Sequence, residues 1–153
     1  MSAIQPLYGW DGLKITYEVS VTVLGGQLVM VDGSTGKVKI TTANAMPLGI
    51  AMTDAAPAGT SDTTVDAWGN SVINASLPGQ YTAVAMEGVF KINNAGAALI
   101  LGDYVKATAA GDVTKATVGT DVIIGKVVGP AAGAGTGEKA HVRLALAPSG
   151  NIT

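Results

Sequence analysis

Residues 13–23 read Leu-Lys-Ile-Thr-Tyr-Glu-Val-Ser-Val-Thr-Val, and this stretch decides the fold class. Apolar and polar residues alternate along it, which places every apolar side chain on one face of an extended chain. An amphipathic helix would instead need apolar residues three and four positions apart. Gly25-Gly26 then ends the run. The pattern predicts a half-buried β-strand.

The rest of the chain repeats this arrangement in shorter runs that are separated by turn residues. Further strands are predicted at Gln27–Val31, Lys37–Thr41, Leu48–Met52, Thr63–Trp68, Tyr81–Ile92, Tyr104–Ala107, Val113–Thr117, Val122–Val128 and Ala140–Leu146. Strands at this spacing predict an all-β fold, a small β-barrel or sandwich of short antiparallel strands. We expect an N-terminal arm over residues 1–12, a single β domain over 13–147 and a C-terminal tail over 148–153.

Two parts of the chain resemble each other at an offset of 76 residues. Gly26-Gln-Leu-Val29 and Gly49-Ile-Ala51 correspond to Gly102-Asp-Tyr-Val105 and Gly125-Lys-Val127. A glycine between them is displaced by one residue, which a hairpin loop can absorb. Two readings stay open. Either two similar β-meanders build one closed or nearly closed barrel, or glycine-rich strands resemble each other by chance.

The composition indicates that part of the surface is covered by other molecules. Charged residues make up 13% of the 153 residues, about half the ~25% of an ordinary soluble domain. A monomer with so few charges has little polar surface to present to water. The formal net charge is -2, and no basic cluster is visible along the chain, which argues against a nucleic-acid partner. No apolar run approaches the ~20 residues of a membrane-spanning helix, so we expect no membrane partner.

The residue types that support catalysis or metal binding are scarce. The chain has no cysteine and one histidine, His141, which excludes thiolate sites and a multi-histidine metal site. His141 shares a predicted strand face with Arg143, so both point to solvent or to a neighbouring subunit. Glu18 and Glu87 are candidates for the paired carboxylates of a glycosidase, but nothing in the sequence brings them together. We expect no enzyme activity, cofactor, metal or small-molecule substrate.

One segment looks like a phosphate-binding loop at first reading. Ser34-Thr35-Gly36-Lys37 contains the Gly-Lys pair, but Val31 stands where that loop needs glycine and Val38 where it needs serine or threonine. The segment also joins two predicted strands and does not open a helix. It predicts a hairpin turn.

A family resemblance follows from the order of the strand and turn fragments. The series is Gly49-Ile-Ala51, Val84-Ala-Met-Glu-Gly-Val-Phe90, Gly102-Asp-Tyr-Val105, Ile124-Gly-Lys-Val-Val128 and Val142-Arg-Leu144. It resembles the small capsid cement, or head decoration, proteins of tailed bacteriophages. The resemblance covers roughly residues 19–147, and the extended stretch 60–80 departs from the shorter members.

The resemblance implies a structural virion protein. Its expected partners are the major capsid protein and itself, as a homotrimer on the outer surface of the expanded head, which it would stabilise after synthesis in the host cytoplasm. Candidate capsid or subunit contacts are the large apolar side chains Leu7, Tyr8, Trp10, Trp68 and Tyr81. The alternatives are another virion β-module (a tail, spike or fibre domain) or a carbohydrate-binding module, since exposed aromatic rings can stack on sugars.

Overall fold

The chain folds into two five-stranded antiparallel sheets, each built from one half of the sequence. This computed structural model describes residues 14–60, 68 and 79–146, and contains no helix in that part of the chain. The first sheet contains β1 (Lys14–Glu18), β2 (Leu28–Val31), β3 (Val38–Ile40), β4 (Gly49–Ala51) and β5 (Tyr81–Ala85). The second contains β6 (Gly88–Asn93), β7 (Tyr104–Ala107), β8 (Val113–Lys115), β9 (Gly125–Gly129) and β10 (Lys139–Leu144). The all-β prediction is confirmed.

The two sheets have the same topology. Their strand orders are β1-β5-β4-β2-β3 and β6-β10-β9-β7-β8, so each strand of the first sheet has a counterpart five elements later. The registers match as well. Leu28 pairs with Ile50 and Val29 with Gly49, whereas Tyr104 pairs with Lys126 and Val105 with Gly125, all at an offset of 76. The internal repeat seen in the sequence is therefore a structural duplication.

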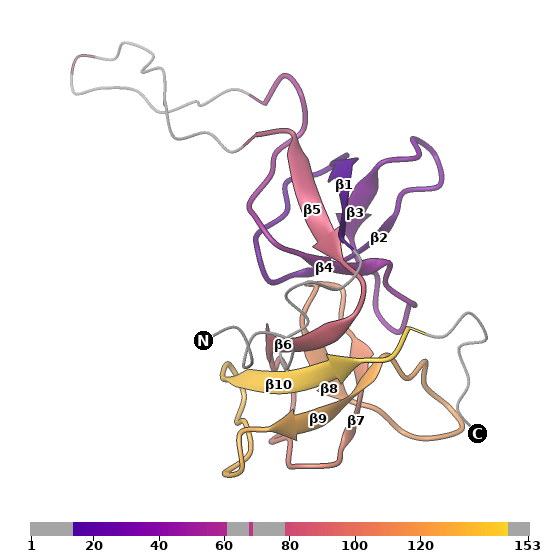
Figure 1. Ribbon diagram of the computed structural model, residues 1–153, viewed down its shortest axis with the longest axis vertical. Helices are drawn as coiled ribbons and strands as arrows, with labels where there is room; N and C mark the ends of the chain where they lie inside the picture. Colours follow the sequence, from indigo (N-terminus) through magenta and orange to yellow (C-terminus); the bar gives the residue numbers. More distant parts are fainter. Residues whose placement is uncertain (1–13, 61–67, 69–78, 147–153) are drawn as a thin grey trace.

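The duplication extends to the points where each sheet curls round. A parallel bridge joins Val19 to Val38 in the first half, and its counterpart joins Asn94 to Val113 in the second. The two repeats do not, however, combine into one sheet, in contrast to the reading in which two β-meanders build one barrel. Each repeat pairs only with itself, and the chain passes from β5 to β6 through Met86 and Glu87. We call residues 14–85 lobe 1 and residues 88–146 lobe 2 (Figure 1).

Two predicted strands differ from the observed ones for identifiable reasons. The strand predicted at residues 13–23 ends at Glu18, because the chain then bends and the Ser20 amide donates to Val38 O at 2.9 Å. The predicted burial of alternate residues is not observed in β1, where Ile15 is 41% exposed. Val19 and Val23 are fully buried, whereas Val21 is 41% exposed. Tyr81–Ile92 was expected as one run but is split between the two sheets. Residues 63–67 of the predicted Thr63–Trp68 strand, and the domain boundaries near residues 12 and 147, lie outside the described residues.

In each lobe, two neighbouring strands approach each other closely at a glycine. A Cβ at Gly49 would meet the backbone carbonyl of Ala85, and one at Gly125 would lie 2.5 Å from the carbonyl oxygen of Arg143. Because no side chain fits between the strands at Gly49 or Gly125, glycine is required at both positions. The repeated glycine that revealed the duplication thus has a packing cause.

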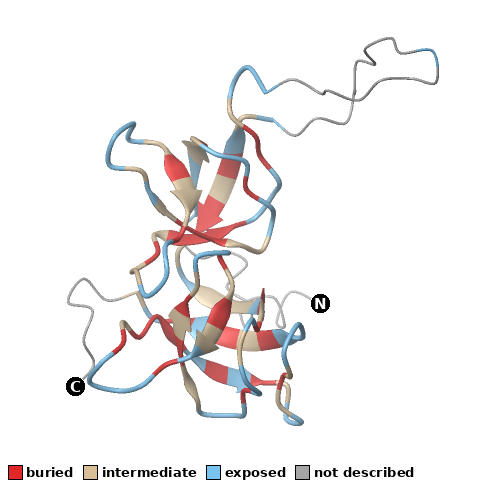
Figure 2. Cartoon of the chain, turned by 180° about the vertical axis from the view of Figure 1, so that it is seen from behind, coloured by how far each residue is buried: buried red, intermediate tan, exposed pale blue. Residues whose placement is uncertain are grey.

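The core consists of two clusters, and one of them spans both lobes. Val19, Val23, Val29, Val38 and Val84 form most of the cluster inside lobe 1. The larger cluster is built mainly from lobe 2 but includes Leu28, Ile50 and Ala85 of lobe 1. Buried segments accordingly run through each lobe and meet between them (Figure 2).

Candidate contact surfaces

The aromatic residues predicted as contacts are exposed where the structure describes them. Trp68 is 86% exposed and Tyr81, the first residue of β5, is 52% exposed. Leu7, Tyr8 and Trp10 lie outside the described residues. The prediction that these five residues touch capsid or subunit neighbours stays a prediction.

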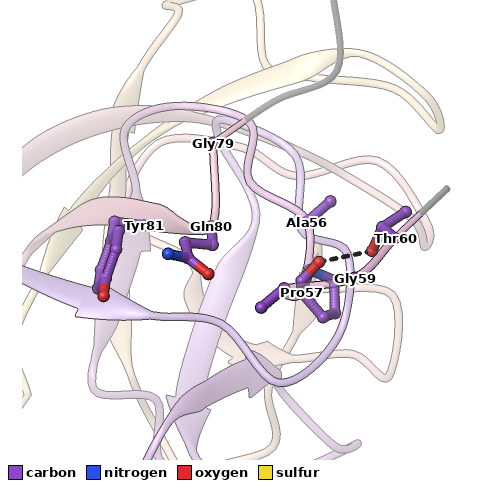
Figure 3. Close-up of a pocket in the computed structure, with 8 residues that line it drawn as sticks. Ala56, Pro57, Gly59, Thr60, Gly79, Gln80 and Tyr81 are labelled. Carbon is purple, nitrogen blue, oxygen red and sulfur yellow. Dashed lines mark hydrogen bonds between the residues drawn. The ribbon is translucent and has the colours of Figure 1, made fainter. Parts of the chain in front are cut away.

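Tyr81 borders a shallow hollow of about 460 Å³ at the end of lobe 1 (Figure 3). Its other walls come from residues 56–60, Gly79 and Gln80. Thr60 closes one side, because its hydroxyl donates to Pro57 O at 2.7 Å. The described residues of the walls carry no carboxylate, imidazole or amine.

The two lobes pack against each other through one face of the first sheet. Alternate residues of β2, β4 and β5 point to opposite sides of the first sheet: Val29, Ala51 and Val84 into lobe 1, and Leu28, Ile50 and Ala85 against lobe 2. Hydrogen bonds frame this contact. Leu28 N donates to Gly111 O at 2.7 Å, Asn44 N donates to Ala107 O at 2.9 Å, and the Thr41 hydroxyl donates to Thr108 O at 2.9 Å.

The corresponding face of the second sheet is not covered within the described structure. At the offset of the duplication, Tyr104 and Lys126 stand where Leu28 and Ile50 stand in lobe 1. Arg143, which pairs with Lys126 in β10, takes the place of Ala85, which pairs with Ile50 in β5. Lys126 and Arg143 are exposed, and the Lys126 ammonium lies 5.6 Å from the centre of the Tyr104 ring. Sequence reasoning missed this face, apart from placing His141 and Arg143 together.

In the described part of the chain, four ion pairs hold loops or turns to strands. The Lys115 ammonium lies 2.8 Å from Asp103, and this hydrogen bond is the main cause that lowers the pKa of Asp103. The pKa of Asp121 is lowered chiefly by the Thr117 amide and also by Lys106, whose ammonium is 2.9 Å away. Both carboxylates serve structure, because each is bonded to neighbouring chain segments.

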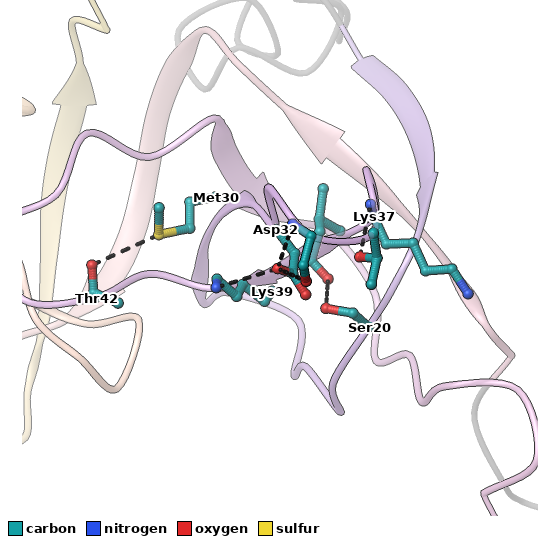
Figure 4. A network of polar contacts seen from close by, with 9 residues as sticks. Ser20, Met30, Asp32, Lys37, Lys39 and Thr42 are labelled. Atoms are coloured by element: carbon teal, nitrogen blue, oxygen red, sulfur yellow. Dashed lines mark hydrogen bonds and ion pairs between the residues drawn. The ribbon is translucent and has the colours of Figure 1, made fainter.

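The turn between β2 and β3 contains a further polar network (Figure 4). Asp32 accepts a hydrogen bond from the Ser34 hydroxyl at 2.9 Å and lies 3.4 Å from the Lys39 ammonium. Hydrogen bonds from Ser20 and Ser34 lower the pKa of Asp32 well below its usual range. This network confirms Ser34–Lys37 as a hairpin turn.

The two glutamates considered as paired carboxylates, Glu18 and Glu87, lie at different places in the fold. Glu18 pairs with Lys37 at 2.6 Å, whereas Glu87 is exposed in the link between the lobes. No group of three or more potential metal ligands occurs within residues 14–60, 68 and 79–146. In the same part of the chain, no helix is long and apolar enough to cross a membrane.

Comparisons with known proteins give a similar fold and a family match over part of the chain. The N base of the head fibre of bacteriophage phi29, gp8.5, has a similar structure, with a TM-score of 0.59, 15% identity and coverage of 88% of this chain and 95% of that one. The C-terminal fragment of gene product 12 of the same phage aligns with a TM-score of 0.46 and 14% identity over 84% of this chain and 96% of that one. No curated protein matches the chain.

A match at the level of sequence settles the predicted resemblance. Residues 71–144 match the phage cement protein family, and this range contains β5 and every strand of lobe 2. The family comprises structural proteins of the virion and not enzymes. The predicted resemblance to the phage cement proteins is therefore confirmed over residues 71–144.

Proposed function

We propose that this protein is a capsid decoration protein that binds the outer surface of the expanded head as a homotrimer and stabilises it. The observation that carries the proposal is the family match over residues 71–144. A molecule that binds only the assembled shell stabilises that shell by mass action. Repetition of the contact over many lattice sites adds avidity.

Two features of the chain support this role. Its low charge content suits close contacts with neighbouring subunits, because large obligate interfaces are more apolar than ordinary surface. Trp68 and Tyr81 present aromatic rings at the surface, and aromatic residues are enriched in protein interfaces. We propose these two residues, with Leu7, Tyr8 and Trp10, as contacts to the capsid or to trimer neighbours.

Binding to undecorated expanded capsids tests the proposal. The protein is expected to co-sediment with them and to raise the temperature at which they are disrupted. Light scattering is expected to give a mass near three times the 15.2 kDa of the chain. A protein that stays in the supernatant would reject capsid binding. A 15.2 kDa particle both alone and on the capsid would reject the trimer.

A second candidate is the base of a head fibre, favoured by the shared fold with the phi29 head fibre N base. A fibre base needs to attach but not to reinforce the shell. Capsids that bind the protein with no change in disruption temperature would favour the fibre base. Saturable binding to a glycan array that is lost in Tyr81→Ala would instead favour a carbohydrate-binding module.

A further inference from the structure

The charged residues in the strands of the second sheet are all basic, although the whole chain has a formal net charge of -2. Strands β6 to β10 contain six of the nine lysines and arginines and no aspartate or glutamate. Two of the six, Lys106 and Lys115, are held in ion pairs. The other four are exposed: Lys91, Lys126, Lys139 and Arg143.

These four side chains come together because β10 lies between β6 and β9 (Figure 1). Lys139 and Arg143 alternate in β10 with the buried residues Ala140 and Val142, so both point outward. Arg143 is directly opposite Lys126, and His141 is directly opposite Lys91. We call Lys91, Lys126, Lys139, His141 and Arg143 the basic face.

Within the described structure, no carboxylate compensates the charges of the basic face. None of its lysines or its arginine forms an ion pair with a carboxylate of residues 14–60, 68 or 79–146. Like charges directly opposite each other across two strands destabilise a sheet. A pair such as Arg143 and Lys126 therefore costs stability in the isolated chain, and a negatively charged partner would remove that cost.

In lobe 1, the equivalent face of the sheet forms a contact with another part of the protein. This face, around Leu28, Ile50 and Ala85, is buried by contact with lobe 2. In lobe 2 the same positions carry Tyr104, Lys126 and Arg143. The duplication thus provides the same sheet face twice, once apolar and covered, and once basic and open.

We propose that the basic face binds an acidic, Asp- and Glu-rich patch on the capsid surface. This inference rests on the proposed function and names the chemistry of the contact. Complementary charges would orient the protein on the shell and speed its association, and this effect is weakened by salt. Binding of the basic face to nucleic acid, the other common polyanion, would contradict the proposal.

Charge reversal tests the proposal, using co-sedimentation with undecorated expanded capsids. Lys126→Glu and Lys91→Glu are each expected to weaken binding about tenfold or more, and the affinity of the unmodified protein is expected to fall as NaCl is raised. Lys14→Glu is the matched control, because Lys14 is an exposed strand lysine of lobe 1. It changes the net charge equally and is expected to leave binding within about twofold.

A stability measurement separates a lost contact from a damaged fold. In Lys126→Glu the new carboxylate would face Arg143 across the strands, so this variant is expected to keep or raise the urea midpoint while it weakens binding. Weakened binding with a lowered midpoint would assign the effect to misfolding and overturn the proposal.

The remaining outcomes distinguish the inference from the proposed function. If the unmodified protein binds capsids and Lys126→Glu and Lys91→Glu bind equally well, the basic face is rejected and the decoration role stands. If the unmodified protein does not bind capsids, both are rejected. Saturable binding to duplex DNA at physiological salt that is lost in Lys126→Glu would identify the face as a nucleic-acid surface and overturn the proposal.

Discussion

The backbone amide of Leu28 donates a hydrogen bond of 2.7 Å to the carbonyl oxygen of Gly111, and this bond crosses from lobe 1 to lobe 2. Gly111 has a φ of +78°, and a Cβ there would lie 2.9 Å from Cβ of Gln27 and 3.1 Å from O of Leu28. The lobes therefore approach each other as closely as a glycine allows. Gly36, its counterpart in the β2–β3 turn, has a φ of +69° and open space around it.

This difference predicts unequal costs for the same substitution. Gly36→Ala is expected to lower the free energy of unfolding by about 1–2 kcal/mol, the cost of a left-handed backbone at a residue with a Cβ. Gly111→Ala is expected to cost about 1–3 kcal/mol more, because the added carbon also crowds the junction. Urea denaturation of the two variants measures both. Equal losses of unfolding free energy in the two variants would show that the junction accommodates a Cβ at Gly111.

Ile50 and Lys126 provide a second matched pair, since they hold equivalent positions in the two sheets. Ile50 is 3% exposed at the junction, so Ile50→Ala is expected to lower the free energy of unfolding by about 2–4 kcal/mol. Lys126 is exposed, and Lys126→Ala is expected to stay within about 0.5 kcal/mol. Denaturant midpoints of the two variants provide the measurement. A small effect of Ile50→Ala would mean that the lobes contribute little to each other's stability.

Local sequence pattern was enough to predict most of the described strands and to suggest the duplication as one of two readings. The turn glycines and the offset of 76 residues are visible without the structure, because strand and turn preferences act over a few neighbouring residues. The junction was not predictable in this way. Leu28, Ile50 and Ala85 look like core residues of their own lobe, and only the register of β2, β4 and β5 shows that they point out of it.

The basic face escaped sequence reasoning for a related reason. Lys91 and Lys126 are far apart in the chain and come close only because β10 lies between their strands. Only the alternation of Lys139, His141 and Arg143 was visible along the sequence. A search for charge runs cannot detect a patch that is built across strands. The division of Tyr81–Ile92 into β5 and β6 was hidden similarly, since both strands have the same local pattern.

The ion pair of Asp121 with Lys106 predicts a loss of stability in acid. The folded-state pKa of Asp121 is lowered, so the carboxylate stabilises the fold above the unfolded-state pKa of about 3.9 and this contribution is lost as pH falls toward the folded pKa. Asp121→Asn is expected to be less stable than the unmodified protein at neutral pH. The difference should shrink below about pH 4. Urea midpoints measured across this range test the sign, and a difference that grows in acid would contradict it.

Asn94 carries the last prediction, because it is a fully buried polar side chain at the position where lobe 1 has Val19. Its amide nitrogen lies 3.0 Å from the carbonyl oxygens of both Ala97 and Ala134, and its side-chain oxygen accepts the Gly96 amide at 3.0 Å. Asn94→Ala removes the side-chain partner of the Gly96 amide and the Ala97 carbonyl, and it leaves the Ala134 carbonyl with only the Leu99 amide, which donates to it at 2.9 Å. This loss is expected to cost about 1–3 kcal/mol of unfolding free energy.

The neighbouring Asn93 is the control for this substitution. It is partly exposed and donates its side-chain hydrogen bond to Asp112 at 3.0 Å. Water can replace that bond, so Asn93→Ala is expected to cost about 1 kcal/mol or less. Urea unfolding of both variants at neutral pH makes the comparison. Equal losses would show that water reaches the Asn94 site and that the turn it holds opens readily in the native protein.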